Sequence, residues 1–400
     1  TIHDSRLTIM KTLSTLTSVS HLECSSCGKW YDAYKLQTFA GCCNKPLLVK
    51  YSPEVFFQKE MLKDRPWNMW RYHEMLPVLE KENIVSLGEG MTPMMRLDNI
   101  GNKYEYLNLL MKDEGKNPTG SFKARGLSAA ISKAKENGIE TCIIPTAGNA
   151  GGAMAAYCAA AGMRAIVVMP RHTPKMFMDE CEVFGAKLIL VDGLISDCAK
   201  KVASLKHEIE AFDISTLKEP YRIEGKKTMG YEIAEQLNWE LPDVILYPTG
   251  GGTGLIGMWK AFQEMISLGW IRKKLPRMIA VQAENCQPIM KTWIGEQSNC
   301  KAYIGKPSVA NGLAVPNPFG EDLILQVLRE SNGFPIAISD VEMIASIREL
   351  ADKEGIFVAP EGGALLAALK QLTKEERVNR AEKILLLNTG SGYKYMENLQ

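Results

Sequence analysis

The sequence predicts an α/β protein whose parallel sheets are covered by helices on both faces. From about residue 104, short apolar runs of strand length alternate with amphipathic segments of helical length. A chain of 400 residues suffices for two domains, and a hydrophobic fraction of 46% supplies a buried core for each. Strands that alternate with helices form parallel sheets, because each crossover helix returns the chain to the same edge of the sheet.

The expected elements follow one another in a regular order. Ligands in such folds gather at the carboxyl ends of strands, so residues that directly follow a strand are the candidates for chemistry. Residues 53–86 also show the apolar spacing of helices and pack against the main body. The expected strands are 142–145, 165–169, 187–191, 244–247, 278–281 and 384–387. The expected helices are 150–161, 196–210, 228–237 and 255–266.

The pattern predicts three parts along the chain. We expect a large domain from 85–125 and 210–400, and a small α/β domain from 126–209. The N-terminal extension, 1–84, includes a ribbon-like module at 21–52 that is rich in cysteine and aromatic residues.

Composition excludes several classes of partner. The formal net charge of +1 gives no electrostatic reason to expect nucleic acid or an anionic membrane surface. The chain contains no run of about 18 apolar residues, and its first residues lack the apolar stretch of a secretion signal. Most of the 10 cysteines are scattered, which is typical of a reducing compartment. We therefore expect a cytoplasmic protein that acts on a small molecule.

Lys123 is the strongest candidate for chemistry. It lies in the segment 117–126, where a Pro-Thr-Gly turn is followed by Ser121, a residue that can cap a helix. This places Lys123 in the first helical turn, where a cation is electrostatically disfavoured. A lysine there has a reason to be deprotonated, and a neutral amine is the nucleophile that forms an imine. The alternative is an ordinary solvated lysine.

A second candidate segment, 145–152, follows an expected strand and opens an alanine-rich helix. Backbone amides at a helix start bind anions. Asn149 can donate a hydrogen bond to a cofactor oxygen, and Thr146 can hold a carboxylate. The alternative is a strand-to-helix turn whose glycine and asparagine residues only satisfy backbone geometry.

A glycine-rich loop follows the expected strand 244–247. Its backbone amides can approach an anion closely at the start of a helix, which is typical of a phosphate-binding loop. It lacks the Lys-Ser/Thr ending of a nucleotide-hydrolysing loop and the downstream acid of a dinucleotide site, and so fits a cofactor phosphate. The alternative is a flexible loop. The residues concerned are Gly250, Gly251, Gly252, Thr253 and Gly254.

The segment 387–392 follows the last expected strand. Thr389 can offer its hydroxyl to a ring nitrogen, and a neutral partner there keeps a pyridine unprotonated. The alternative is a threonine that caps a turn.

Together and in order, these segments resemble the fold-type II enzymes that use pyridoxal phosphate (PLP). The resemblance covers about residues 85–395 and implies two three-layer α/β domains with parallel sheets and the cofactor between them. Within that superfamily, 87–93, 222–228 and 389–394 are similar to motifs of the threonine synthase family.

The resemblance implies a role for each candidate residue. The reaction would convert O-phospho-L-homoserine and water into L-threonine and phosphate, in a homodimer. Lys123 would be the Schiff-base lysine and proton shuttle. The cofactor contacts would be Asn149 to the phenolic oxygen, 250–254 to the phosphate and Thr389 to the ring nitrogen, and the substrate contacts would be Thr146, Ser121 and Arg222.

The sequence departs from the family pattern at several positions. Ala124 stands where the family commonly has aspartate, and Ser391 where it commonly has histidine. The loop at 250–254 resembles that of threonine and serine ammonia-lyases, so a PLP-dependent ammonia-lyase or related β-elimination enzyme is the alternative. A non-catalytic scaffold is disfavoured because it needs no amine at Lys123. A nucleic-acid binder acting through the ribbon is disfavoured by the neutral charge.

The N-terminal cysteines leave two interpretations open. Cys24 and Cys27 form half of a zinc ribbon, with two thiolates on one turn. In the partner half, Ala40 stands where the first thiolate is expected, and Cys42 and Cys43 are adjacent, which is a strained pair for one metal ion. The module is therefore either a zinc site or a metal-free ribbon held by its own small core.

Overall fold

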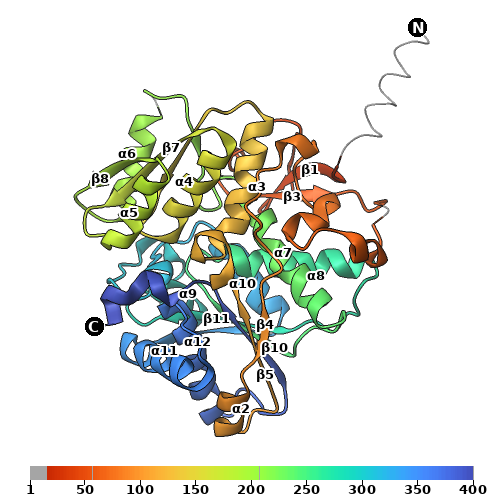
Figure 1. Cartoon of the computed structure of the whole chain (residues 1–400), viewed down its shortest axis with the longest axis vertical. Helices are drawn as coiled ribbons and strands as arrows, with labels where there is room; N and C mark the ends of the chain where they lie inside the picture. Colours follow the sequence, from red (N-terminus) through yellow and green to blue (C-terminus); the bar gives the residue numbers. More distant parts are fainter. Residues whose placement is uncertain (1–15, 56, 207, 400) are drawn as a thin grey trace.

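The computed structural model describes residues 16–55, 57–206 and 208–399, which form three sheets with their helices (Figure 1). The N-terminal sheet is antiparallel, with the order β2-β1-β3. Its strands are β1 (Val19–Cys24), β2 (Trp30–Tyr31) and β3 (Leu47–Tyr51).

The large sheet has six strands in the order β12-β11-β10-β13-β5-β4. Neighbouring strands from β12 to β5 are parallel, and β4 is an antiparallel edge strand. The strands are β4 (Met94–Arg96), β5 (Asn108–Asp113), β10 (Val244–Pro248), β11 (Arg277–Ala283), β12 (Phe334–Ile338) and β13 (Lys383–Asn388).

The small sheet has four parallel strands in the order β8-β7-β6-β9. Its last strand, β9, pairs with β6 although it lies after residue 209, the expected end of the small domain. The boundaries of the domains therefore remain a proposal. The strands are β6 (Thr141–Pro145), β7 (Arg164–Pro170), β8 (Lys187–Val191) and β9 (Phe212–Asp213).

Helices cover both faces of the two parallel sheets (Figure 1). The large-sheet helices are α2 (Asp98–Tyr104), α7 (Tyr221–Gln236), α8 (Thr253–Ser267), α9 (Pro288–Trp293), α10 (Glu321–Glu330), α11 (Asp340–Glu354) and α12 (Pro360–Lys374). The small-sheet helices are α3 (Lys123–Glu136), α4 (Asn149–Ala161), α5 (Lys175–Val183) and α6 (Ile195–Leu205). The short 3₁₀ helices are η1 (Lys59–Asp64), η2 (Met69–Met75), η3 (Lys81–Asn83), η4 (Glu114–Lys116), η5 (Pro118–Gly120), η6 (Cys300–Ala302), η7 (Asn311–Leu313) and η8 (Gly392–Leu399).

The apolar strands are continuous because both of their faces are buried. In β13, Leu385 and Leu387 pack into the core shared with α7, α8 and α10, while Ile384 and Leu386 pack against α11 and α12. Neither face needs polar residues, so the sequence of the strand is one apolar run and does not alternate between apolar and polar residues.

Residues 53–86 differ from the sequence expectation. The helical spacing there corresponds only to the short helices η1, η2 and η3. Pro53, Pro66 and Pro77 interrupt the segment, and proline cannot donate the backbone hydrogen bond that a longer helix interior requires. Trp70 and Tyr72 of this segment nevertheless pack against the main body and are buried, whereas Trp67 is 64% exposed.

Within the described ranges, no helix is both long and apolar enough to cross a bilayer.

Candidate active site

Lys123 is the first residue of α3, as the sequence predicted. The chain reaches it from the carboxyl end of β5 through η4 and η5. Its Nζ lies 4.1 Å from the ring centroid of Phe122. Burial, together with the positive charge of Arg222, lowers the pKa of Lys123 to about 7. A substantial fraction of the amine is therefore neutral near neutral pH, as an attacking nucleophile requires.

Two further cations lie beside Lys123. We call Lys123, Arg222 and Lys226 the cation trio. Burial lowers the pKa of all three, and the positive charge of Arg222 lowers the pKa values of Lys123 and Lys226 further. Lys226 Nζ lies 4.7 Å from the centroid of the same Phe122 ring and donates a 2.6 Å hydrogen bond to Thr253 Oγ1. In the part of the chain that the structure describes, no member of the trio forms an ion pair within 4.0 Å. Buried cations without carboxylate partners favour an anionic ligand such as phosphate.

Arg222 lies in the first turn of α7, which begins earlier than the predicted helix 228–237. Its guanidinium donates to the carbonyl of Ile214 at 2.7 Å and to Thr216 Oγ1 at 3.4 Å. Its Nε is buried without a partner. Glu219 accepts hydrogen bonds from the backbone N–H groups of Tyr221 and Arg222, and burial raises its pKa to about 7 against the effect of the Arg222 charge. Arg222 therefore keeps donor capacity for a ligand.

The glycine-rich loop connects β10 to α8 and passes beside Arg222. Gly252 has a φ of 75°, a conformation that favours glycine. A Cβ on Gly250 would come within 2.1 Å of the carbonyl oxygen of Gly312, and a Cβ on Gly251 within 3.0 Å of Thr216 Cγ2. The glycines are therefore required by close backbone packing, in addition to any role as an anion cradle.

Asn149 opens α4 at the carboxyl end of β6, as expected. Its Nδ2 donates to Tyr395 Oη at 3.0 Å, and its Oδ1 is buried without a partner. Thr146 accepts a 3.3 Å hydrogen bond from the backbone N–H of Gly148 through Oγ1, so its hydroxyl closes the turn. Asn149 thus joins the small sheet to the C-terminal segment and keeps an acceptor free.

The expected helix cap at Ser121 is wrong. The residue before α3 is Phe122, and no side chain caps the helix. Ser121 instead pairs with Gly390 in an antiparallel bridge, which fixes its backbone in the extended form, and its Oγ is buried without a partner. The hydroxyl is therefore available to a ligand.

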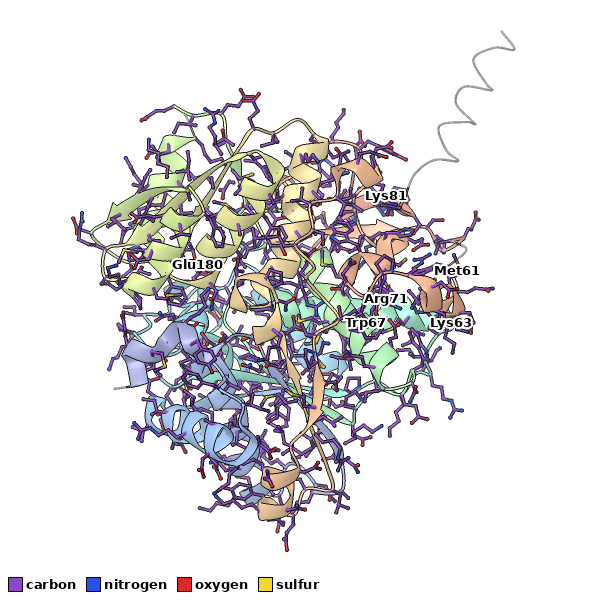
Figure 2. All side chains as sticks on the ribbon, in the orientation of Figure 1. Met61, Lys63, Trp67, Arg71, Lys81 and Glu180 are labelled. Carbon is purple, nitrogen blue, oxygen red and sulfur yellow. The ribbon has the colours of Figure 1, made fainter. Side chains whose placement is uncertain are left out.

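Thr389 lies directly after β13 and is buried. Its carbonyl accepts a 3.1 Å hydrogen bond from the backbone of Phe122. Further along, Lys394 forms a 2.6 Å ion pair with Glu180 of α5. Glu180 lies on the side of α5 that faces the C-terminal segment (Figure 2). These contacts hold the chain after β13 against both the lysine helix and the small-sheet layer.

Glu361 and Tyr395 belong to the same site, and the sequence reasoning missed both. Glu361 opens α12 and accepts a 2.7 Å hydrogen bond from the backbone of Gly312 and a 3.3 Å bond from Tyr395 Oη. Burial raises the pKa of Glu361, and its Oε2 has no partner. A glutamate in the first turn of a helix, directly before a run of small and apolar residues, is the local signal for Glu361. Lys226 lies in the segment 222–228, and its local sequence indicates no role of its own.

A fully buried ion network anchors the start of α3. Arg125 bonds Glu114 at 2.5 and 2.8 Å and Glu232 of α7 at 2.5 and 2.6 Å. Lys112 pairs with Glu232 at 3.0 Å. Burial alone would raise the pKa of Glu232, but the charges of Arg125 and Lys112 lower it to about 2. The network therefore fixes the helix that carries Lys123.

Arg125→Ala should destabilise the protein by about 3–5 kcal/mol, because it leaves two buried carboxylates with too little positive charge. The free energy of unfolding in urea measures this. The control is Arg96→Ala, whose ion pair with Asp98 is 55% and 65% exposed and should contribute at most about 1 kcal/mol. Equal effects of the two substitutions would contradict the anchoring role.

Comparison with known proteins agrees with this geometry. Residues 85–390 match the model of the family described as "Pyridoxal-phosphate dependent enzyme". The chain is 34% identical to threonine synthase of Methanocaldococcus jannaschii over 93% of its length and 92% of the relative's. It is 33% identical to threonine synthase of Methanosarcina acetivorans, covering 92% and 91% of the two chains.

The chain belongs to the threonine synthase family of PLP-dependent enzymes.

Solved structures of this family's wider fold are also similar. Diaminopropionate ammonia lyase from Escherichia coli has a TM-score of 0.66 at 20% identity, over 80% of this chain and 89% of that one. Maize serine racemase has a TM-score of 0.64 at 23% identity, over 77% and 93%. At these identities the likeness shows the fold-type II architecture alone.

The residues of this family member fit PLP. A buried amine of lowered pKa, unpaired cations beside a glycine-rich loop, and unpartnered polar atoms on Ser121 and Asn149 meet in one place. These are a nucleophile for an aldehyde, partners for a phosphate and donors or acceptors for a hydroxylated ring. The predicted metal ligands Cys24, Cys27, Cys42 and Cys43 lie in the N-terminal sheet unit instead.

Replacing Glu361 by glutamine should lower the pKa of Lys123 below about 7, because the carboxylate charge of Glu361 raises it. The pH at which half of the amine is neutral then moves down. We expect this shift in the pH dependence of the rate at which PLP attaches to the cofactor-free protein. Glu375→Gln, an exposed residue just after α12, is the control. A midpoint that stays in place or moves up would contradict the assignment.

Proposed function

We propose that this protein converts O-phospho-L-homoserine and water into L-threonine and phosphate. The observation that carries the proposal is the cation trio, in which Arg222 and Lys226 lie beside the nucleophilic lysine without carboxylate partners. A substrate with a second phosphate, beyond that of the cofactor, satisfies this excess of buried positive charge.

The chain's own residues have separate tasks in this reaction. Bound PLP supplies the electron sink that stabilises negative charge at the carbon bearing the amino group. Lys123 holds the cofactor and takes the proton from that carbon, since its lowered pKa makes it both a base and an acid near neutral pH. Lys123 then takes a proton from the neighbouring carbon, and phosphate departs from the terminal carbon toward Arg222. A proton is returned to the terminal carbon, which becomes the methyl group, water adds at the neighbouring carbon, and Lys123 returns a proton to the carbon that bears the amino group.

The remaining residues bind and orient. We assign Asn149 to the phenolic oxygen of the cofactor, and Thr389 to its ring nitrogen. Ser121 and Thr146 bind the substrate carboxylate. These assignments are supported by the buried, unpartnered Oγ of Ser121 and by the Asn149 amide, which donates one of its two N–H groups to Tyr395 Oη and can offer the other to the cofactor. The loop Gly250–Gly254 binds the cofactor phosphate. Lys226 donates a hydrogen bond to Thr253 of this loop.

Product analysis tests the proposal. The purified, PLP-loaded protein is given O-phospho-L-homoserine in one tube and L-threonine or L-serine in others. Threonine and phosphate released in equal amounts is the expected result. Oxoacid and ammonia from the unphosphorylated amino acids, with no reaction of the phosphorylated one, would overturn it.

The second candidate is a PLP-dependent threonine or serine ammonia-lyase. The glycine-rich loop favours it, since Gly250–Gly254 lacks the asparagine that is common in the synthases. An ammonia-lyase has no need for Arg222 as a phosphate ligand, and so the effect of substituting Arg222 separates the two candidates.

We also propose that the protein is a homodimer and works in the cytoplasm. We further propose a large domain from 85–125 and 210–400 and a small domain from 126–209. Light scattering during size-exclusion chromatography measures the mass in solution, and a monomer mass would contradict the homodimer. Family membership and the scattered, unpaired cysteines support these proposals.

A further inference from the structure

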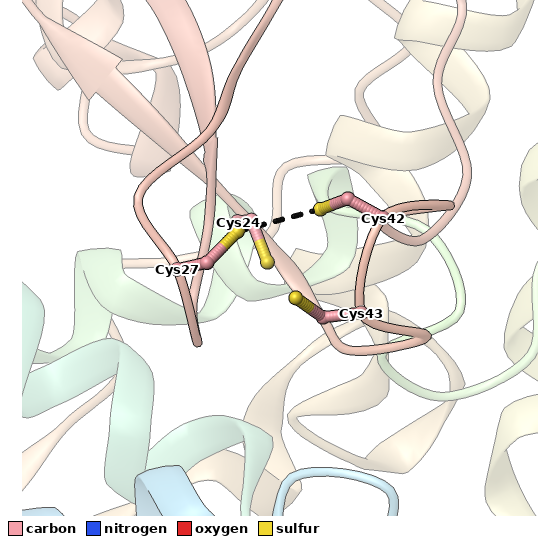
Figure 3. A group of neighbouring side chains, drawn as sticks. All are labelled: Cys24, Cys27, Cys42 and Cys43. Atoms are coloured by element: carbon pink, nitrogen blue, oxygen red, sulfur yellow. Dashed lines mark hydrogen bonds between the residues drawn. The ribbon is translucent and has the colours of Figure 1, made fainter.

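Four cysteines of the N-terminal unit meet at one point (Figure 3). One is the last residue of β1, one lies in the turn that follows β1, and two come from the loop between β2 and β3. Every pair of their sulfur atoms lies within 4.8 Å, and Cys27 Sγ lies 3.5 Å from Cys42 Sγ. We call this set the cysteine cluster; its members are Cys24, Cys27, Cys42 and Cys43.

We propose that the cysteine cluster binds one zinc ion. In a tetrahedral zinc–thiolate site with bonds of about 2.3 Å, neighbouring sulfurs lie about 3.8 Å apart, which is close to the separation seen here. A disulfide requires about 2.05 Å and joins only two sulfurs, whereas four sulfurs here share one centre. Four thiolates so close together repel one another unless a cation lies between them.

The backbone on both sides of the cluster is fixed in tight turns. The N–H of Gly28 bonds the carbonyl of Cys24 at 3.0 Å, and the N–H of Asn44 bonds the carbonyl of Ala40 at 2.8 Å. Asn44 has a φ of 52°, in the left-handed region that asparagine tolerates in turns. The sulfurs of the adjacent Cys42 and Cys43 both lie in the cluster.

The ligand set points to zinc in a structural role. All four ligands are soft thiolates, and with four of them no position is left open for substrate or water. His21, the histidine of this unit, lies outside the cluster, with its ring stacked on Trp30 at 3.9 Å between centroids. A metal ion held by residues of both segments would tie the end of β1 to the loop between β2 and β3 and so stabilise this small sheet.

The same loop touches the active-site helix. The backbone N–H of Gln37 donates to Tyr221 Oη at 2.9 Å, and Tyr221 directly precedes Arg222 at the start of α7. On the other side of the unit, Tyr51 Oη donates to Glu224 Oε2 at 2.7 Å. We infer that the zinc-held unit keeps the first turn of α7 in place, with Tyr221 as a positioning residue for Arg222; this part rests on the proposed function.

Metal analysis of the PLP-loaded protein tests the site. We expect about one zinc ion per chain in the wild type, and none in Cys27→Ser or Cys42→Ser. Ser26→Ala, which changes an exposed residue between two of the proposed ligands, is the matched control and should keep the metal. Wild-type protein without zinc after incubation with the metal, iron in its place, or zinc retained in both serine variants would overturn the proposal.

A second measurement does not depend on the folding of a variant. Cobalt exchanged into the wild-type protein should show the visible absorption of a tetrahedral tetrathiolate site, and its absence would contradict the ligand set. For the effect on the site, Cys27→Ser should raise KM for O-phospho-L-homoserine by about tenfold while PLP stays attached to Lys123. An unchanged KM in a zinc-free variant would overturn the inference that the zinc-held unit keeps Arg222 in place. Absence of any reaction in the wild type would instead count against the proposed function.

Discussion

Lys123→Ala should abolish both the covalent attachment of PLP and the formation of threonine. Lys123 is the buried amine at the start of α3 whose pKa is lowered to about 7. Removing a covalent nucleophile that also moves protons lowers the rate by about 10³-fold or more. Reduction with borohydride followed by peptide mass spectrometry locates the attachment, and product analysis gives the rate.

The control for Lys123 is Lys116→Ala, an exposed lysine of the loop that leads to α3. It should retain cofactor and activity. Turnover that survives in Lys123→Ala, or a cofactor attached to another lysine in the wild type, would refute the central role of this residue.

Arg222→Ala should lower kcat/KM for O-phospho-L-homoserine by about 30- to 3000-fold, which corresponds to about 2–5 kcal/mol for a buried charge-assisted contact. PLP should stay attached, because Lys123 is intact. Arg222→Lys should restore only part of the activity, since a lysine offers a point charge and not a bidentate fork. Arg171→Ala, whose side chain is 60% exposed, should leave the rate unchanged.

The pH dependence separates a charge effect of Arg222 from a merely structural one. The positive charge of Arg222 lowers the pKa of Lys123, so Arg222→Ala should raise that pKa above about 7. The attachment of PLP to the cofactor-free variant then requires higher pH. Full activity of Arg222→Ala on the phosphorylated substrate would instead overturn the assignment of Arg222 as a ligand of the substrate phosphate.

The sequence by itself determined the architecture and the position of Lys123 at the start of a helix. Strand and helix periods are local properties, so the alternation of β6, α4, β7 and β10, α8 was predictable to within a few residues. The place of Lys123 in the first turn of α3 was predictable for the same reason, because turn residues and helix starts are encoded by neighbours along the chain.

Only the tertiary structure decided which side chains complete the site. Tyr395 reaches Asn149 across 246 positions of sequence, and Arg125 reaches Glu232 across 107. Such pairs leave no local pattern, since their partners are brought together by the packing of the two sheets. The spacing of Cys42 and Cys43 argued against a shared centre, yet both sulfurs lie within 4.8 Å of those of Cys24 and Cys27. Sequence periodicity thus describes each segment, whereas burial and long-range contact decide what its side chains do.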